Sequence, residues 1–172
     1  MKKIMLMIVT TLLTSNLFAQ TCPVGIKQTK PDSQYILVGD NEALVVDSKT
    51  GLMWMRCSLG QTWDGSNCTG SGGATFFTWQ QGLNEADSFS FAGFDGWRVP
   101  TVKELDSLVE PACYSPAINV VIFPNTVSDY YWSSSPYADH TTRAQCITFF
   151  YGSHSSCNKI SSESVRLVRI EQ

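Results

Sequence analysis

Six cysteines have the side chains with the clearest chemistry in this sequence, because two thiols can be oxidised to a disulfide. They are Cys22, Cys57, Cys68, Cys113, Cys146 and Cys157. An even number is typical of disulfides in chains that fold in oxidising compartments. Cys146 and Cys157 flank a predicted hairpin centred near Tyr151 and Gly152, so we expect them opposite each other. Cys57 and Cys68 bracket a loop rich in Gly, Asp and Asn, and Cys22 and Cys113 pair by elimination.

Metal and cofactor chemistry finds little support in the sequence. No Cys-x-x-Cys occurs, and the two histidines, His140 and His154, stand apart from any second cluster of ligand-type residues. Calcium needs six to eight oxygen ligands. Glu110-Pro111 is followed by Ala112, where sugar-binding C-type lectins carry Asn, and no Trp-Asn-Asp triplet occurs. We therefore predict no metal site and no cofactor.

Catalytic candidates are equally weak. They are Ser133–Ser135, the neighbouring Asp139 and His140, and the carboxylates Asp95 and Glu104. The sequence contains no nucleophile elbow, phosphate loop or metal motif around any of them. The prediction is that the protein is not an enzyme.

Side chains that could bind a ligand non-covalently are three cations and three aromatic residues. They are Arg143, His154 and Lys159, with Trp63, Tyr130 and Tyr137. Cations complement sulfate or carboxylate groups, and exposed rings can stack on sugar faces. The three cations lie in or beside the predicted Cys146–Cys157 hairpin, so they can share one surface. The alternative is that they are ordinary solubilising residues.

The beginning of the chain resembles a secretory signal peptide. Met1-Lys2-Lys3 precedes an apolar run over residues 4–13, and Ala19 is a small residue at the expected cleavage site. The run is about half of the ~20 residues that cross a bilayer, so we do not expect an integral membrane protein. A lipoprotein attached through Cys22 is the alternative, although Ala19-Gln20-Thr21 lacks the usual attachment pattern. We predict a signal peptide over 1–19 and an exported chain over 20–172, periplasmic or extracellular.

Composition narrows the class of partner. Hydrophobic residues make up 43% and aromatic residues 12%, which is typical of a packed globular domain. The net charge is −3, and it becomes −5 once Lys2 and Lys3 leave with the signal peptide. An acidic surface disfavours general binding to nucleic acid or to anionic membranes.

The elements that must position these side chains can be read from patterns. Residues 44–46 and 52–55 predict two strands around the turn 48–51, and residues 58–74 predict a long loop. Capping boxes predict helices beginning after Thr78 and after Thr101, the second with apolar residues up to Val109 and an end at Pro111. Residues 130–134, 145–151 and 165–170 predict strands, and 115–128 predicts a surface segment. We expect a single α+β domain over 20–172.

Three tryptophans and two arginines are expected to be structural. Trp54, Trp97 and Trp132 lie among apolar neighbours, which predicts burial. Arg56 and Arg98 are expected to pair with carboxylates, Arg98 with Glu104 being the clearest case.

Several ordered sequence blocks carry a family resemblance. They are Asp47-Ser48-Lys49-Thr50-Gly51-Leu52-Met53-Trp54-Met55-Arg56-Cys57, Gly93-Phe94-Asp95-Gly96-Trp97-Arg98-Val99-Pro100-Thr101-Val102-Lys103-Glu104-Leu105, Phe123-Pro124-Asn125-Thr126, Tyr131-Trp132-Ser133-Ser134-Ser135 and Val165-Arg166-Leu167-Val168-Arg169. Over residues 40–169 the chain resembles the Lcl C-terminal domain family, named for the Legionella collagen-like adhesin. The resemblance implies a C-type-lectin-like α+β fold, with two short helices packed on a twisted antiparallel sheet and long loops. Arg98–Thr101 also resembles a segment of the formylglycine-generating-enzyme fold.

The resemblance also implies a function. The namesake domain binds sulfated polysaccharides and assembles as a homotrimer, whereas this chain has no collagen-like repeat and is acidic. We expect an exported, non-enzymatic binding or adhesion domain that recognises polysaccharide, sulfated glycans included. The alternative is a structural or assembly subunit of a surface complex that binds protein.

Overall fold

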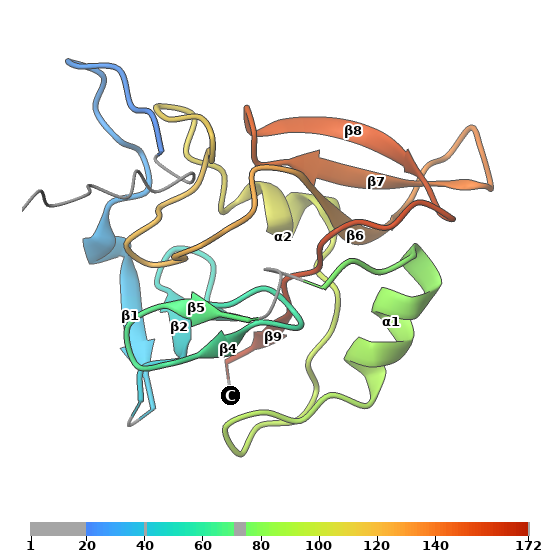
Figure 1. Cartoon of the computed structure of the whole chain (residues 1–172), viewed down its shortest axis with the longest axis horizontal. Helices are drawn as coiled ribbons and strands as arrows, with labels where there is room; N and C mark the ends of the chain where they lie inside the picture. Colours follow the sequence, from blue (N-terminus) through green and yellow to red (C-terminus); the bar gives the residue numbers. More distant parts are fainter. Residues whose placement is uncertain (1–19, 40, 71–74, 172) are drawn as a thin grey trace, which may run out of the picture.

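The computed structural model describes residues 20–39, 41–70 and 75–171 (Figure 1). The predicted signal peptide over 1–19 lies outside the described residues. The fold is α+β, as predicted. Its elements are a 3-10 turn (Asp32–Gln34), β1 (Tyr35–Val38), β2 (Leu44–Asp47), β3 (Leu52–Met55), β4 (Thr62–Trp63), β5 (Cys68–Thr69), α1 (Trp79–Asp87), α2 (Val102–Asp106), β6 (Tyr130–Pro136), β7 (Arg143–Thr148), β8 (Ser153–Asn158) and β9 (Val168–Ile170).

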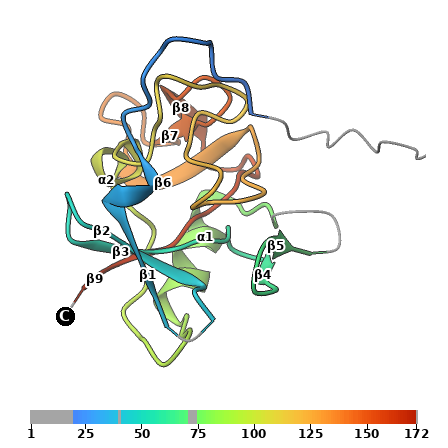
Figure 2. The same ribbon diagram turned by 90° about the vertical axis from the view of Figure 1, so that its left-hand side faces the viewer.

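The described strands form three antiparallel sheets, where the family resemblance implied one. Their orders are β1-β2-β3-β9, β4-β5 and β6-β7-β8, and Figures 1 and 2 show the first and third on opposite sides of the molecule. Both helices pack against the three-stranded sheet. The segment 164–168 contacts both of these sheets in turn. Ser164 bonds to the β6 residues Tyr130 and Trp132, and Val168 then bonds to Arg98 and joins β3.

The predicted β2–β3 hairpin is confirmed. The Asp47 carboxylate accepts hydrogen bonds from the Lys49 backbone N–H and the Thr50 hydroxyl, and Gly51 adopts a left-handed φ of 68°. β1, which the sequence did not predict as a separate strand, pairs with the other edge of β2. The buried apolar side chains of the described residues form two clusters, the first core and the second core. Alternate β2 residues enter different cores, because Leu44 packs in the first and Val45 in the second. Burial on both faces explains the nearly continuous apolar sequence of these strands.

Both predicted helix starts are confirmed. Thr78 and Thr101 each form a capping box, with Gln81 and Glu104 at the third helical position. The second helix ends at Asp106, so its predicted end at Pro111 was wrong. The Ser107 hydroxyl donates to the Glu104 carbonyl, and the chain turns while its apolar residues remain buried. The spacing of apolar residues therefore predicted which side chains are buried, but not where the helix ends.

Residues 115–128 do not wander over the surface as predicted. Ala117 is buried, and Ile118, Ile122 and Phe123 belong to the second core. Asn119 makes this possible, because its side-chain oxygen Oδ1 accepts from the Val121 and Ile122 N–H groups. Its amide nitrogen donates to the Lys30 carbonyl and the Asp32 carboxylate. A single amide side chain thus satisfies backbone groups in a buried segment that has no regular structure.

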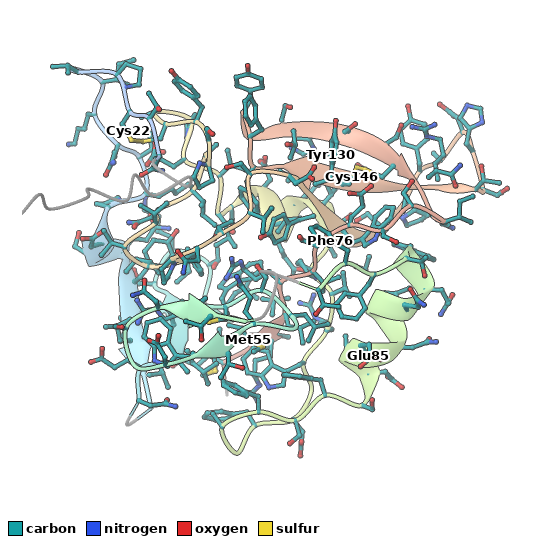
Figure 3. The ribbon with its side chains drawn as sticks, in the orientation of Figure 1. Cys22, Met55, Phe76, Glu85, Tyr130 and Cys146 are labelled. Atoms are coloured by element: carbon teal, nitrogen blue, oxygen red, sulfur yellow. A yellow bond between two sulfur atoms is a disulfide. The ribbon has the colours of Figure 1, made fainter. Side chains whose placement is uncertain are left out.

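The structure forms three disulfides: Cys22–Cys113, Cys57–Cys68 and Cys146–Cys157. These are the pairs expected from the sequence, and Figure 3 labels Cys22 and Cys146. Cys146 and Cys157 are diagonal neighbours and not directly opposite, since Cys146 faces Ser155 and Cys157 faces Ala144. The expected hairpin centre was wrong because the Gly152 N–H bonds to the Thr148 carbonyl and closes the loop 149–152.

The predicted loop over 58–74 contains the short β4–β5 ladder. The Asp64 carboxylate accepts from the Ser66 and Asn67 N–H groups and forms the turn between the two strands. These hydrogen bonds lower the pKa of Asp64. The Trp63 indole N–H donates to the Asn41 carbonyl, 2.5 Å away, and anchors the ladder to the segment before β2.

Arg166 lies fully buried at the junction of the two cores. Its guanidinium donates to the carbonyls of Met55 and Arg56 and to the hydroxyls of Ser58 and Thr126. Its Cζ also lies 4.9 Å from the Phe123 ring centroid. Within the described residues, neither of the two ion pairs includes it. Burial lowers the pKa of Arg166, while Tyr131 opposes that shift. The cation is therefore held by neutral oxygens and aromatic faces.

Arg166→Ala is expected to lower the free energy of unfolding by about 3–5 kcal/mol, because it leaves buried acceptors unpaired and a cavity behind. Guanidinium unfolding of the oxidised protein measures the change. The exposed Lys49→Ala variant is the control and should stay within about 0.5 kcal/mol of wild type. Equal midpoints for Arg166→Ala and wild type would contradict this role.

Candidate functional site

A hollow of about 340 Å³ lies where β6 gives way to β7. It is lined by Tyr137, His140, Thr142, Arg143 and Ser156. The loop between the strands is closed by backbone bonds, since the Tyr137 N–H donates to the Arg143 carbonyl and the Arg143 N–H to the His140 carbonyl. These bonds hold the lining side chains on a short, fixed loop at the open end of the β7–β8 hairpin.

Two rings and one cation are among the side chains that line the hollow. The rings of Tyr137 and His140 are stacked, with centroids 6.2 Å apart and planes 3° from parallel. The Arg143 Nε donates to the Ser156 hydroxyl at 3.1 Å, and a terminal nitrogen donates to the Ser156 carbonyl. In the described part of the chain, Arg143 belongs to neither ion pair. Its charge therefore remains available to an anionic group, while Ser156 fixes its direction.

The structure places the other predicted site residues in separate surroundings. His154 lies 2.8 Å from the Asp106 carboxylate, and the Lys159 ammonium sits 4.1 Å above the Trp79 ring. Trp63 is covered by the Arg56 guanidinium at 4.1 Å, and Tyr130 packs half-buried against the first core. Of the six sequence candidates, Tyr137 and Arg143 share a hollow.

His140 also lines this hollow, although the sequence did not identify it as a candidate for binding a ligand through its ring. The His140 ring stacks on Tyr137 because the loop 137–142 folds back on itself, and no local sequence pattern predicted that conformation. The three-residue spacing between Tyr137 and His140 is the one signal that could have suggested a stacked pair.

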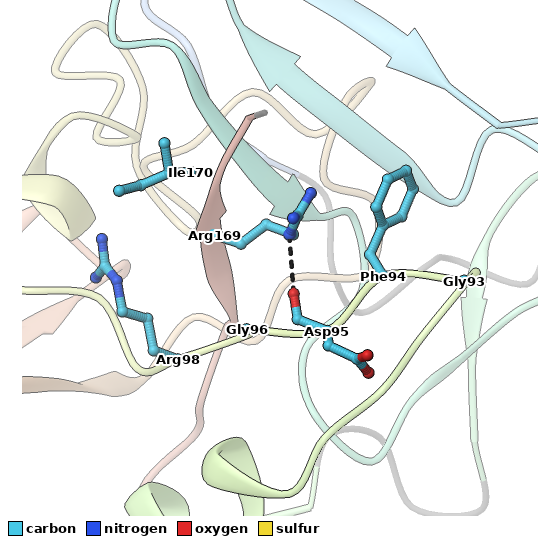
Figure 4. A pocket seen from close by; sticks show the side chains of 7 residues that line it. All are labelled: Gly93, Phe94, Asp95, Gly96, Arg98, Arg169 and Ile170. Atoms are coloured by element: carbon cyan, nitrogen blue, oxygen red, sulfur yellow. Dashed lines mark hydrogen bonds between the residues drawn. The ribbon is translucent and has the colours of Figure 1, made fainter.

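A larger hollow, of about 560 Å³, lies beside β9 (Figure 4). Gly93, Phe94, Asp95, Gly96, Arg98, Arg169 and Ile170 line it. Arg169 donates from Nε to the Asp95 carbonyl at 3.1 Å, and its Cζ lies 4.7 Å from the Phe94 ring centroid. Figure 4 shows Arg98 directed away from Arg169. Arg169 holds the loop 93–98 and Arg98 is bonded to Glu104, so both cations are already engaged, which favours a structural role for this hollow.

The predicted Arg98–Glu104 pair is confirmed, with two parallel bonds of 2.7 and 2.6 Å. This bonding raises the pKa of Arg98 and lowers the pKa of Glu104. The same expectation was wrong for Arg56, which donates to the carbonyls of Glu42, Val121 and Ile122. Carbonyls can replace a carboxylate there because three of them converge on one planar donor.

Across residues 20–39, 41–70 and 75–171, no three His, Cys, Asp or Glu side chains converge as metal ligands. Among the same residues, no helix combines the length and apolar character that crossing a bilayer requires.

Comparison with known proteins identifies one family. The family model described as the Lcl C-terminal domain matches residues 43–169. The resemblance inferred from the sequence blocks is thereby confirmed. The curated proteins include no significant match to this chain.

The Arg98–Glu104 pair predicts a pH dependence of stability. Because the pKa of Glu104 is lowered in the folded state, its contribution is complete above the ordinary value of 4.5 and is lost as pH falls through the lower folded value. Glu104→Gln is expected to cost about 1 kcal/mol at neutral pH, allowing for solvent screening, and to flatten the acid side of the profile. Urea midpoints across a pH series measure both effects.

Glu85→Gln on α1 is the control, because Glu85 is exposed and takes part in neither of the described ion pairs. Parallel pH profiles for Glu104→Gln and wild type would sink the assignment.

Proposed function

This chain belongs to the Lcl C-terminal domain family, and from that premise we propose an exported, non-enzymatic adhesion domain that recognises acidic polysaccharide. The family makes it an adhesin-related domain. The observation that carries the finer proposal is the stacked Tyr137–His140 pair beside Arg143, which takes part in no described ion pair. Export is supported by the three disulfides, which are typical of oxidising compartments.

The hollow's chemistry fits a sulfated or carboxylated sugar. A guanidinium presents a planar set of donors that matches the oxygens of sulfate or carboxylate. Aromatic rings offer an apolar face to the C–H side of a pyranose and can remain partly in water. The hollow is open and is lined by few residues. Such a site is expected to hold one or two sugars of a longer chain rather than to enclose a small molecule.

The surroundings of the former catalytic candidates support a non-enzymatic role. The Ser133 hydroxyl donates to the Gln145 carbonyl, and the Ser135 hydroxyl accepts from the Val102 N–H. Both hydroxyls thus serve the backbone, and Glu104 is committed to Arg98. A nucleophile needs a neighbouring base, and these contacts supply none to either serine.

Two implications of the family resemblance stay predictions. They are the C-type-lectin-like character of the scaffold and assembly as a homotrimer. The acidic net charge of the chain makes local placement of Arg143, and not overall charge, the basis for binding an anionic glycan.

Wild-type protein is expected to be retained on heparin or dextran sulfate at low salt, and Arg143→Ala to bind about tenfold more weakly, because it loses a charge-assisted contact. Tyr137→Ala should weaken binding through loss of stacking. Affinity chromatography with a salt gradient, followed by calorimetry, measures both.

Lys49→Ala removes the same charge from the β2–β3 turn and is the matched control. Absence of wild-type retention on every acidic glycan, or equal losses in Lys49→Ala and Arg143→Ala, counts against the proposal.

A further inference from the structure

Three exposed aromatic rings gather around the closed end of the β7–β8 hairpin. Tyr114, Phe150 and Tyr151 have exposed fractions of 40%, 39% and 68%. The Phe150 and Tyr151 centroids lie 4.4 Å apart in an edge-to-face arrangement, and the Tyr114 and Tyr151 centroids lie 6.3 Å apart with a tilt of 32°. We call these three residues the ring cluster. Large apolar side chains left together in water mark surfaces that meet other molecules.

The backbone beneath the ring cluster is fixed from several directions. Gly152 adopts a φ of 70°, and a Cβ added there would lie 2.4 Å from a methyl group of Val109, so the turn sits directly on the second core. The Ser115 N–H donates to the Phe150 carbonyl at 2.8 Å, which joins the turn to the segment carrying Tyr114. The backbone that carries the rings is therefore fixed before any ligand arrives.

The segment carrying Tyr114 is itself anchored to the chain near residue 20. Tyr114 and Thr21 exchange two backbone hydrogen bonds, of 2.8 and 2.9 Å. The neighbouring Cys113 is bonded to Cys22. Two separate segments thus converge to bring Tyr114 beside Tyr151, although the residues are far apart in sequence.

We propose that the ring cluster is a stacking platform for a neutral polysaccharide, distinct from the hollow around Arg143. A pyranose with equatorial hydroxyls has a flat face of C–H bonds, which packs on an aromatic ring without requiring charge. The cluster contains no ionisable cation or carboxylate, and its two tyrosines place phenol groups where sugar hydroxyls could bond. Tyr151, the most exposed ring, is the main stacking surface, and Phe150 braces it from one side.

The two sites are far enough apart to act separately. Arg143 is the first residue of β7, and Thr148, the last, pairs with Ser153 next to the turn. Five steps along a strand span about 17 Å, which is the length of several sugars. A variant at one site should therefore leave the geometry of the other unchanged.

Native gels containing hydroxyethyl cellulose, galactomannan or laminarin test the platform, followed by calorimetry with cellohexaose or laminarihexaose. Wild-type protein is expected to be retarded by at least one of these neutral probes, to a degree that changes little with salt. Tyr151→Ala and Tyr114→Ala should each weaken binding about tenfold, since stacking surface is lost. Tyr151→Phe keeps the ring and should bind within about threefold of wild type.

Phe76→Ala is the matched control, because Phe76 is an exposed aromatic residue outside the ring cluster (Figure 3). It should bind neutral probes as wild type does. Circular dichroism and thermal unfolding establish that each variant is folded.

The outcomes separate the two sites. No retardation of wild type by any neutral probe overturns the platform, whatever heparin shows. Equal retardation of wild type, Tyr114→Ala and Tyr151→Ala overturns it too. If wild-type protein is not retained on heparin but binds neutral polysaccharides in a way that depends on Tyr151, the acidic-glycan proposal is rejected and the platform is supported.

Discussion

The Arg166 guanidinium occupies the position on which the rest of the fold depends. It donates to the carbonyls at the end of β3, just before Cys57, and to Thr126 at the end of the irregular segment 115–128. These parts of the chain border different cores, and neither core alone would bring them together. A buried cation is costly to desolvate, and here the two terminal nitrogens of the guanidinium are bonded to oxygens while aromatic rings lie beside it. The geometry of the junction is consequently specific, because no apolar side chain could bond the same carbonyls.

The other framework arginines follow the same logic. Arg56 binds three carbonyls, and Arg169 binds the carbonyl of Asp95. Arg98 closes on Glu104. Arg56 and Arg169 thus satisfy loop carbonyls where regular secondary structure is absent, and Arg98 ties its loop to α2 through a carboxylate. Most guanidinium groups therefore hold loops in place, whereas Arg143 at the end of the hairpin is the one that the proposed binding site uses.

Sequence patterns predicted the parts of the fold that depend on neighbours in the chain. The capping boxes at Thr78 and Thr101 and the turn at Asp47 follow from residues a few positions apart, and the Cys57–Cys68 bridge from residues 11 apart. Apart from the Cys22–Cys113 bridge, which followed by elimination, the contacts between distant partners were not predicted. The burial of 115–128 rests on Asn119 reaching Lys30 and Asp32, and the ring cluster rests on Thr21 pairing with Tyr114. The Tyr137–His140 stack was missed because the loop's closure, and not its composition, brings the rings together.

The three bridges differ in the length of chain that each one encloses. Cys57–Cys68 and Cys146–Cys157 each join residues 11 apart, whereas Cys22–Cys113 joins residues 91 apart. The long bridge lowers the conformational entropy of the denatured ensemble, and by loop-closure estimates this stabilises the folded state by about 4–5 kcal/mol, more than either short bridge does. Much of the domain's thermodynamic stability thus resides in a covalent bond that forms under oxidising conditions. The polypeptide held reduced would have the same contacts available and a far larger unfolded population, so its folding equilibrium is tied to the redox potential around it.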